Sequence, residues 1–242
     1  MPNDSILFQK LSSEAMPLFE QVFEDIKSVD KSKLDNPKEY FVSEMYSFYS
    51  LAKNVLETYN NVDNAETVPE LREMLYPIVR RLLESYFRIM YIFDESTKTQ
   101  EHFESYLKYI EKEYDKMLKD LLKYNYPTNG LNPATNNYAH ASKWPRDLKT
   151  MLSYLKNNST TKLTFLYPKY RILCFYAHGN INKSIMDMVF SKQAGATNNF
   201  SVIEIPYILS LIASYYFILI CEFWPDIKAK HTDTLKFFTE QL

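Results

Sequence analysis

The side chains best suited to chemistry lie together in one short apolar segment. Arg171 and His178 stand seven positions apart there, so on a helix, which turns about 100° per residue, they lie within about 20° of one face. A guanidinium can neutralise a phosphate while an imidazole moves a proton, and phosphodiester cleavage needs both tasks. Tyr170 and Asn180 flank the pair and add hydrogen-bonding groups. A structural role explains the same pattern, because a histidine before a glycine often ends a helix and an arginine often clamps neighbouring helices.

A second charged group lies on a helix that is predicted for residues 69–93. Glu84 stands four positions after Arg80 and three after Arg81. It also stands four positions before Arg88, so these charges share a helix face and can pair. The rest of the helix is largely apolar, which predicts that partners in the interior hold the charges. The pattern is typical of a buried clamp between helices and also of a site that binds an anion.

Several function classes are excluded by what the sequence lacks. Its three glycines are too far apart to form a dinucleotide loop, a phosphate-binding loop or a nucleophile elbow. None of the four histidines follows a glutamate at the spacing of di-iron bundles, and C-x-x-C and H-E-x-x-H are absent. We therefore expect neither a metal nor a cofactor. A formal charge of -2 means that binding to nucleic acid would need a local basic patch.

The elements that position these residues are predicted from apolar positions at helical spacing. Residues 125–142 are expected to form a long loop, either functional or mobile. Pro17 is expected to kink or split the first helix. We predict a single all-α domain over residues 1–242, a bundle of about seven or eight helices. The predicted helices cover residues 5–28, 38–59, 69–93, 99–124, 144–156, 168–179, the apolar stretch that ends at 224, and the chain from 226 onward.

One apolar stretch bears on localisation. Residues 205–221 contain seventeen uncharged positions, which is at the lower limit for a membrane span of about 17–25 residues. We interpret the stretch as a helix buried in the core, with membrane association as the less favoured alternative. Cys174 and Cys221 both lie in apolar surroundings, which predicts reduced thiols, and the first residues lack the pattern of a secretory signal. We therefore expect a cytoplasmic protein.

The spacing of the arginine and the histidine resembles a known family. Arg171 and His178, with six residues between them, fit the arginine, four to six residues, histidine motif of the HEPN superfamily of all-α proteins. The order of features is also similar to that of an uncharacterised bacterial HEPN-like family of unknown function. That pattern has Arg-x-x-x-Glu, here at 80–84, then a short helix led by Trp144, then Tyr and His-Gly, here at 170–179. The resemblance covers about residues 40–225.

The resemblance implies a metal-independent endoribonuclease, of the kind found in toxin-antitoxin and phage-defence systems. The 2′-hydroxyl of RNA would attack the adjacent phosphate and leave a cyclic phosphate end. Arg171 would stabilise the charged phosphorane, and His178 would donate or accept a proton. The implied partners are RNA, a second copy of the chain in a homodimer, and an antitoxin or other protein. Supporting or substrate-binding roles fall to Arg80, Arg81, Glu84, Arg88, Tyr170 and Asn180.

The residue after the motif arginine leaves an alternative open. Many catalytic members of the superfamily have Asn, Asp or His there, whereas this chain has Ile172. Other members are inactive and serve as binding or scaffold domains. The alternative function is therefore a non-catalytic helical module that binds a protein or a nucleotide.

Overall fold

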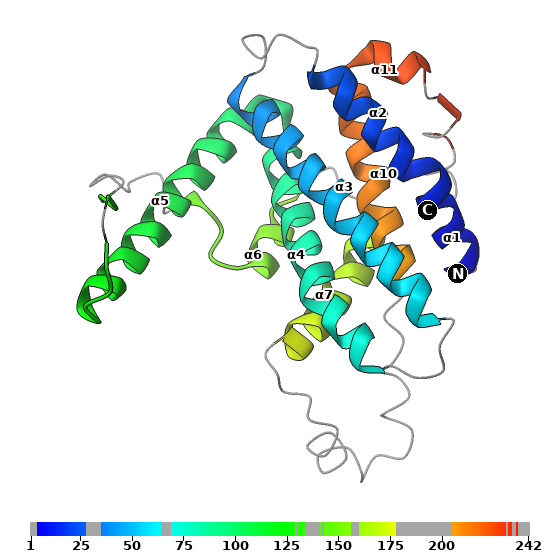
Figure 1. Cartoon of the computed structure of the whole chain (residues 1–242). Helices are drawn as coiled ribbons and strands as arrows, with labels where there is room; N and C mark the ends of the chain where they lie inside the picture. The colour runs from blue at the N-terminus through cyan, green and yellow to red at the C-terminus, as the bar shows by residue number, and fades with distance from the viewer. Residues whose placement is uncertain are drawn as a thin grey trace. The chain divides into compact units, whose positions relative to one another are not determined.

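The protein is an all-α helical bundle, as the sequence predicts (Figure 1). The computed structural model describes residues 4–27, 35–63, 69–128, 130–133, 141, 143–155, 160–177, 205–230, 232–233 and 236. The α-helices in this part of the chain are α1 (Asp4–Lys10), α2 (Met16–Lys27), α3 (Asn36–Asp63), α4 (Pro69–Phe93), α5 (Thr99–Lys123), α6 (Leu148–Ser153), α7 (Thr160–Ala177), α10 (Ile205–Phe223) and α11 (Pro225–Lys230). A π-helix, η1 (Leu11–Ala15), joins α1 to α2, and a 3₁₀ turn, η3 (Ser96–Lys98), precedes α5.

Pro17 explains why the first predicted helix is divided. A proline has no N–H to donate, and its ring collides with the carbonyl four residues earlier. The chain widens into the π-helix η1 just before it, where the Met16 N–H bonds to the Leu11 carbonyl, five residues back. The helix therefore continues past the proline, but with one wider turn.

The bounds of the central helices follow local signals. α4 begins and ends at the predicted residues, and α5 ends one residue before its predicted end. α3 begins two residues before the predicted 38, because Asp35 caps its first turn by accepting a hydrogen bond of 2.9 Å from the Lys38 N–H, and it ends at Asp63, four residues after the predicted 59.

Two predicted helices have clearly wrong bounds. The helix predicted for 144–156 is only α6, since the Asp147 carboxylate accepts a 2.8 Å hydrogen bond from the Thr150 N–H and fixes the start. The helix predicted to begin near Pro168 begins at Thr160, with Pro168 inside it. Leu166 and Leu173, one on each side of the proline, are fully buried, and this packing offsets the lost backbone bond. The predicted end of that helix at 179 lies outside the described residues.

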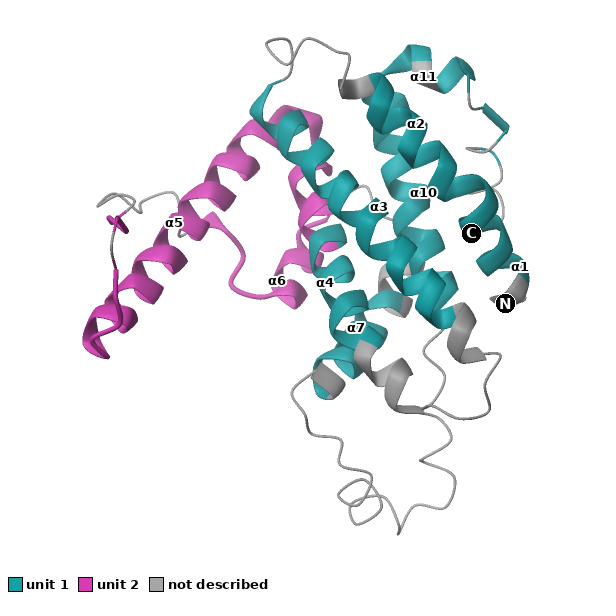
Figure 2. Cartoon of the chain, in the orientation of Figure 1, with its two compact units in different colours: residues 1–86, 160–242 teal, residues 87–159 magenta. Residues whose placement is uncertain are grey.

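The chain divides into two compact units (Figure 2). Unit 1 comprises residues 1–86 and 160–242. Its core surrounds α10, which contacts α1, η1 and α3. Phe19 stacks on Phe217 with ring centroids 4.4 Å apart, and the Tyr216 ring meets Phe41 and Phe48 edge to face. The predicted single domain stays a prediction, because compact units of one chain often fold together.

Unit 2 comprises residues 87–159 and has an aromatic core. The Trp144 ring lies 5.3 Å from that of Tyr91 and 4.9 Å from that of Tyr106, measured between centroids. His102 stacks on Tyr91, and its Nδ1 lies 2.9 Å from the Tyr91 carbonyl oxygen. The prediction that Trp144 begins a helix is therefore wrong. Trp144 lies in the turn before α6 and anchors that turn.

α10 is the one described helix that is long and apolar enough to cross a membrane, with a mean hydropathy of 1.7. Most of its residues, 72% of the span, are buried inside the protein. This burial is what a core helix shows, and membrane association is left to experiment.

Candidate functional site

Polar side chains of α4 and α7 meet inside unit 1. The Arg80 Nε donates a 3.0 Å hydrogen bond to the Glu84 carboxylate, one helical turn away on α4. The Tyr170 hydroxyl, on α7, donates a 3.0 Å hydrogen bond to the same carboxylate oxygen. Cys174 lies one turn after Tyr170 on the same helix, and its thiol helps to raise the pKa of the phenol. We call these four residues the α4–α7 polar cluster.

The electrostatics of this cluster fix its protonation. Burial raises the pKa of the Tyr170 phenol above its ordinary value, and the hydrogen bond with Cys174 and the charge of Glu84 raise it further. Burial lowers the pKa of the Arg80 guanidinium, but the charge of Glu84 and the hydrogen bond with it outweigh this, so the pKa is raised overall. At neutral pH the raised pKa values keep the Tyr170 phenol and the Arg80 guanidinium protonated, so both can donate to Glu84.

The predicted site residues fall into two groups in the structure. Arg80, Glu84 and Tyr170 are partly buried and bind one another. Arg81 and Arg171 are exposed, and neither forms an ion pair or hydrogen bond with any residue in the described part of the chain. The first group connects α4 to α7, and the second is available to a ligand.

The other predicted residues are not among the four that define this cluster. Arg88 belongs to unit 2, where its guanidinium carbon lies 5.8 Å from the centroid of the Tyr106 ring. His178 and Asn180 lie outside the described residues. The pairing of Arg171 with His178 therefore stays a prediction.

The sequence analysis does not predict two polar contacts, one within α7 and one between α4 and α3. It treats Cys174 only as a thiol in apolar surroundings, although its spacing of four from Tyr170 places both on one face of α7. Ser85 was not considered, yet its buried hydroxyl donates to the Glu44 carboxylate of α3. No sequence signal pointed to this second contact, because it joins residues far apart in the chain.

The arrangement can bind an anion at the exposed face of α7. Arg171 follows Tyr170 directly, so the hydrogen bond from Tyr170 to Glu84 holds the backbone that carries Arg171. An exposed guanidinium on a fixed helix suits a phosphate group, which it can contact through two N–H groups.

Metal ligands do not gather in the part of the chain that is described. No group of three or more His, Cys, Asp or Glu side chains lies close enough there to hold a metal ion.

Comparison of the chain with protein-family models, with curated proteins and with solved structures gives no match.

Proposed function

We propose that the protein is a HEPN-like, metal-independent endoribonuclease, acting in the cytoplasm as a toxin or phage-defence effector. The observation that supports this best is Arg171, whose guanidinium is exposed and has no protein partner within the described structure. A purely structural arginine would be held by a carboxylate or carbonyl, as Arg80 is by Glu84. The resemblance in the spacing of Arg171 and His178 supplies the reaction class.

The reaction needs one anion-binding group and proton transfer. The RNA 2′-oxygen forms a bond to the adjacent phosphorus as its proton leaves to a base. The bond from phosphorus to the 5′-oxygen then breaks, and that oxygen takes up a proton, which leaves a cyclic phosphate and a 5′-hydroxyl. Arg171 would neutralise the extra charge on the phosphorane, and the His178 imidazole would transfer the proton.

The resemblance also implies a homodimer with both motifs at one interface. Such a dimer would supply two imidazoles, one to accept the proton of the 2′-hydroxyl and one to donate to the leaving oxygen. Arg81, exposed on α4, would add positive charge for the RNA backbone.

The test is RNA cleavage in the presence of EDTA. Purified protein is incubated with total RNA, and the products are examined for cyclic phosphate ends. We expect Arg171→Ala and His178→Ala each to lower the cleavage rate by about 100-fold or more, the scale of a lost electrostatic or acid-base contribution. Arg146→Ala is the matched control, because Arg146 is also an exposed arginine but lies in unit 2.

Two results decide the proposal. The proposal is supported if Arg146→Ala still cleaves RNA and both motif variants do not, while the circular dichroism of all three variants matches that of the wild type. A wild-type protein that cleaves no RNA, as monomer or dimer, contradicts it.

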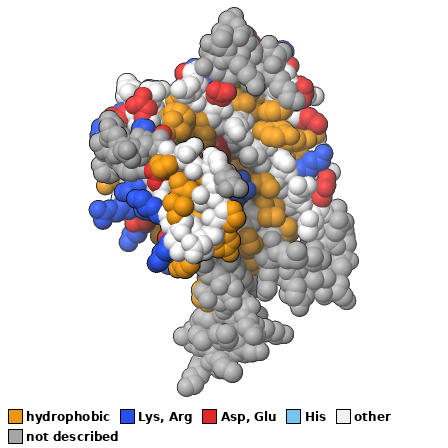
Figure 3. All heavy atoms as spheres, turned by 60° about the vertical axis from the view of Figure 1, so that its left-hand side comes forward, with side chains coloured by type: hydrophobic (Ala, Val, Ile, Leu, Met, Phe, Trp, Pro, Cys, Tyr) orange, Lys and Arg blue, Asp and Glu red, His pale blue; other side chains and the backbone are white. Residues whose placement is uncertain are grey.

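A second candidate function, a module that binds a partner protein, is favoured by one face of α5. Apolar side chains recur there at alternating spacings of three and four, which is the pattern that pairs helices. Four of them are exposed and two are half-buried. Figure 3 shows hydrophobic side chains at the surface beside both basic and acidic ones. We call this face the α5 exposed stripe; it consists of Leu107, Ile110, Tyr114, Met117, Leu121 and Tyr124.

The charges beside the stripe define the partner. Glu111 and Glu113 flank it, and each forms an ion pair within α5, with Lys108 at 2.7 Å and with Lys116 at 2.5 Å. Asp120, beside Glu113, forms no ion pair with any residue that the structure describes, so an amphipathic helix with Lys or Arg at that flank would neutralise it. A synthetic helix with Leu at the same spacing and Lys at its flanks is the probe. Met117→Glu should abolish binding of this helix, and Lys119→Glu, on the opposite face of α5, should leave binding unchanged. This pair of results would support the function.

A further inference from the structure

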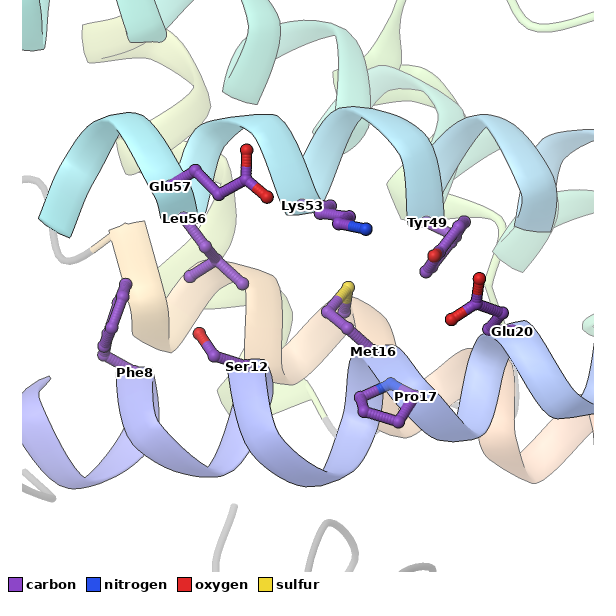
Figure 4. A pocket seen from close by; sticks show the side chains of 9 residues that line it. All are labelled: Phe8, Ser12, Met16, Pro17, Glu20, Tyr49, Lys53, Leu56 and Glu57. Atoms are coloured by element: carbon purple, nitrogen blue, oxygen red, sulfur yellow. The ribbon is translucent and has the colours of Figure 1, made fainter. Parts of the chain in front are cut away.

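A pocket of about 320 Å³ opens in unit 1 between the N-terminal helices and α3 (Figure 4). Ligand pockets occupy about 300–1,000 Å³, so this volume suits a small molecule rather than a cofactor or a nucleotide chain. The pocket contains none of the residues of the α4–α7 polar cluster, and the inference drawn from it does not depend on RNA cleavage.

The π-helix η1 builds one wall of the pocket. π-helical turns are rare and are frequently found at functional sites. Ser12 lies in this turn and Pro17 just after it, and both line the pocket. In Figure 4 the Ser12 hydroxyl points toward α3 across the opening. The wider turn therefore places a hydrogen-bonding group at the pocket.

The interior of the pocket is apolar. Met16 and Leu56 line it and are only 5% and 2% exposed. The rings of Phe8 and Tyr49 line its two ends and are half-buried. These four side chains can cover an aliphatic or aromatic group of a ligand.

Charged groups surround this interior without neutralising one another. Glu20 and Glu57 form no hydrogen bond or ion pair with any residue that the structure describes. The Lys53 ammonium points toward Tyr49, 5.9 Å from its ring centroid, although Glu57 is one helical turn away. By contrast, the Lys10 ammonium and the Glu14 carboxylate, also in the N-terminal helices, form an ion pair at 2.6 Å. One ammonium and two carboxylates thus remain available to a bound molecule.

We propose that this pocket binds a free amino acid with an apolar side chain. The ligand carboxylate binds Lys53, and its ammonium group binds Glu20 or Glu57. The ligand side chain packs on Met16 and Leu56. A zwitterion fits because a ligand with only an ammonium group would leave Lys53 without a partner, and a ligand with only a carboxylate would leave both Glu20 and Glu57 without one.

The test measures binding of phenylalanine, leucine and methionine to the full chain by saturation-transfer NMR. Two further probes each lack one charge: phenethylamine has no carboxylate, and 3-phenylpropionate has no ammonium group. We expect phenylalanine to bind at least about tenfold more tightly than either, because each lost charge-assisted contact costs about that factor.

Matched variants locate the binding. Ser12→Phe fills the pocket, whereas Ser13→Phe, at the exposed neighbouring position, does not. Lys53→Gln removes the carboxylate partner, and Lys10→Gln is its control outside the pocket. We expect Ser12→Phe and Lys53→Gln to weaken binding by about tenfold or more, with the controls unchanged. Lack of binding by all three amino acids, or equal binding of the singly charged probes, would overturn the proposal.

Discussion

α10 in unit 1 and α5 in unit 2 are both long helices rich in apolar residues, yet their surfaces are used differently. α10 is buried on nearly all sides, because α1, η1 and α3 contact it. α5 buries Phe103 and Tyr106 in its first half and Leu118 further along, and leaves the α5 exposed stripe at the surface. An apolar helix face therefore predicts that the face is covered by other apolar groups. Only the neighbouring elements show whether those groups belong to the same chain or must come from a partner.

The largest effect is expected from truncation in the core around α10. Phe217 is 3% exposed and stacks on Phe19, so Phe217→Ala removes a ring from close packing and leaves a cavity. We expect a loss of about 4 kcal/mol in the free energy of unfolding, measured by urea denaturation. Ile218→Ala, the next residue on the same helix but 39% exposed, should lose less than about 1 kcal/mol. Equal losses would mean that α10 is not buried as described.

Trp144→Ala applies the same test to unit 2. The Trp144 side chain is 5% exposed and contacts Tyr91 and Tyr106. We expect a loss of about 3 kcal/mol, at the low end for an aromatic truncation, because a turn relaxes around a cavity more readily than a helix core does. Hydrogen exchange should accelerate at residues 87–159 more than in unit 1. Uniform acceleration would show instead that the two units unfold together.

A smaller effect is expected from the polar contact between α4 and α7. Tyr170→Phe removes the hydrogen bond to Glu84 and should lower the free energy of unfolding by about 1 kcal/mol, since both partners are partly exposed. The Phe variant keeps the ring, so the change reports the hydroxyl alone.

The same variant has a predicted pH dependence. The pKa of Tyr170 is raised in the folded protein, so the phenol contributes its full stability below its unfolded pKa of about 10. Above that pH the phenol of the unfolded chain ionises first, and the contribution is lost as the pH rises toward the folded pKa. The difference between wild type and Tyr170→Phe should therefore narrow above about pH 10. A constant difference across this range would contradict the shift.

The smallest effect on stability is expected in the α5 exposed stripe. Ile110 is 42% exposed, so Ile110→Gln should change the free energy of unfolding by less than about 0.5 kcal/mol. Tyr106→Gln, at a buried position one turn earlier in the same helix, should cost several times more. If both changes destabilise equally, the stripe is covered by the protein itself and is not available to a partner.

Much of the fold could be predicted because helices leave local signals in the sequence. The bounds of α4 were predicted correctly from Pro69 and the apolar spacing, and the division at Pro17 follows from the missing N–H. The start of α7 could not be predicted, because burial of Leu166 and Leu173 outweighs the local preference for proline at a first turn.

For the candidate site, the sequence placed Arg80 and Glu84 on one helix face, since four residues make about one helical turn. It also identified Arg171 as a candidate for binding phosphate. Only the tertiary structure decided that Glu84 binds Arg80 and Tyr170 together, and that Arg81 and Arg171 remain exposed. The physical reason is that spacing along a helix sets which side chains are neighbours on that helix. The contact between α4 and α7 joins residues that are far apart in the sequence. That contact sets which charges are buried with a partner and which face water.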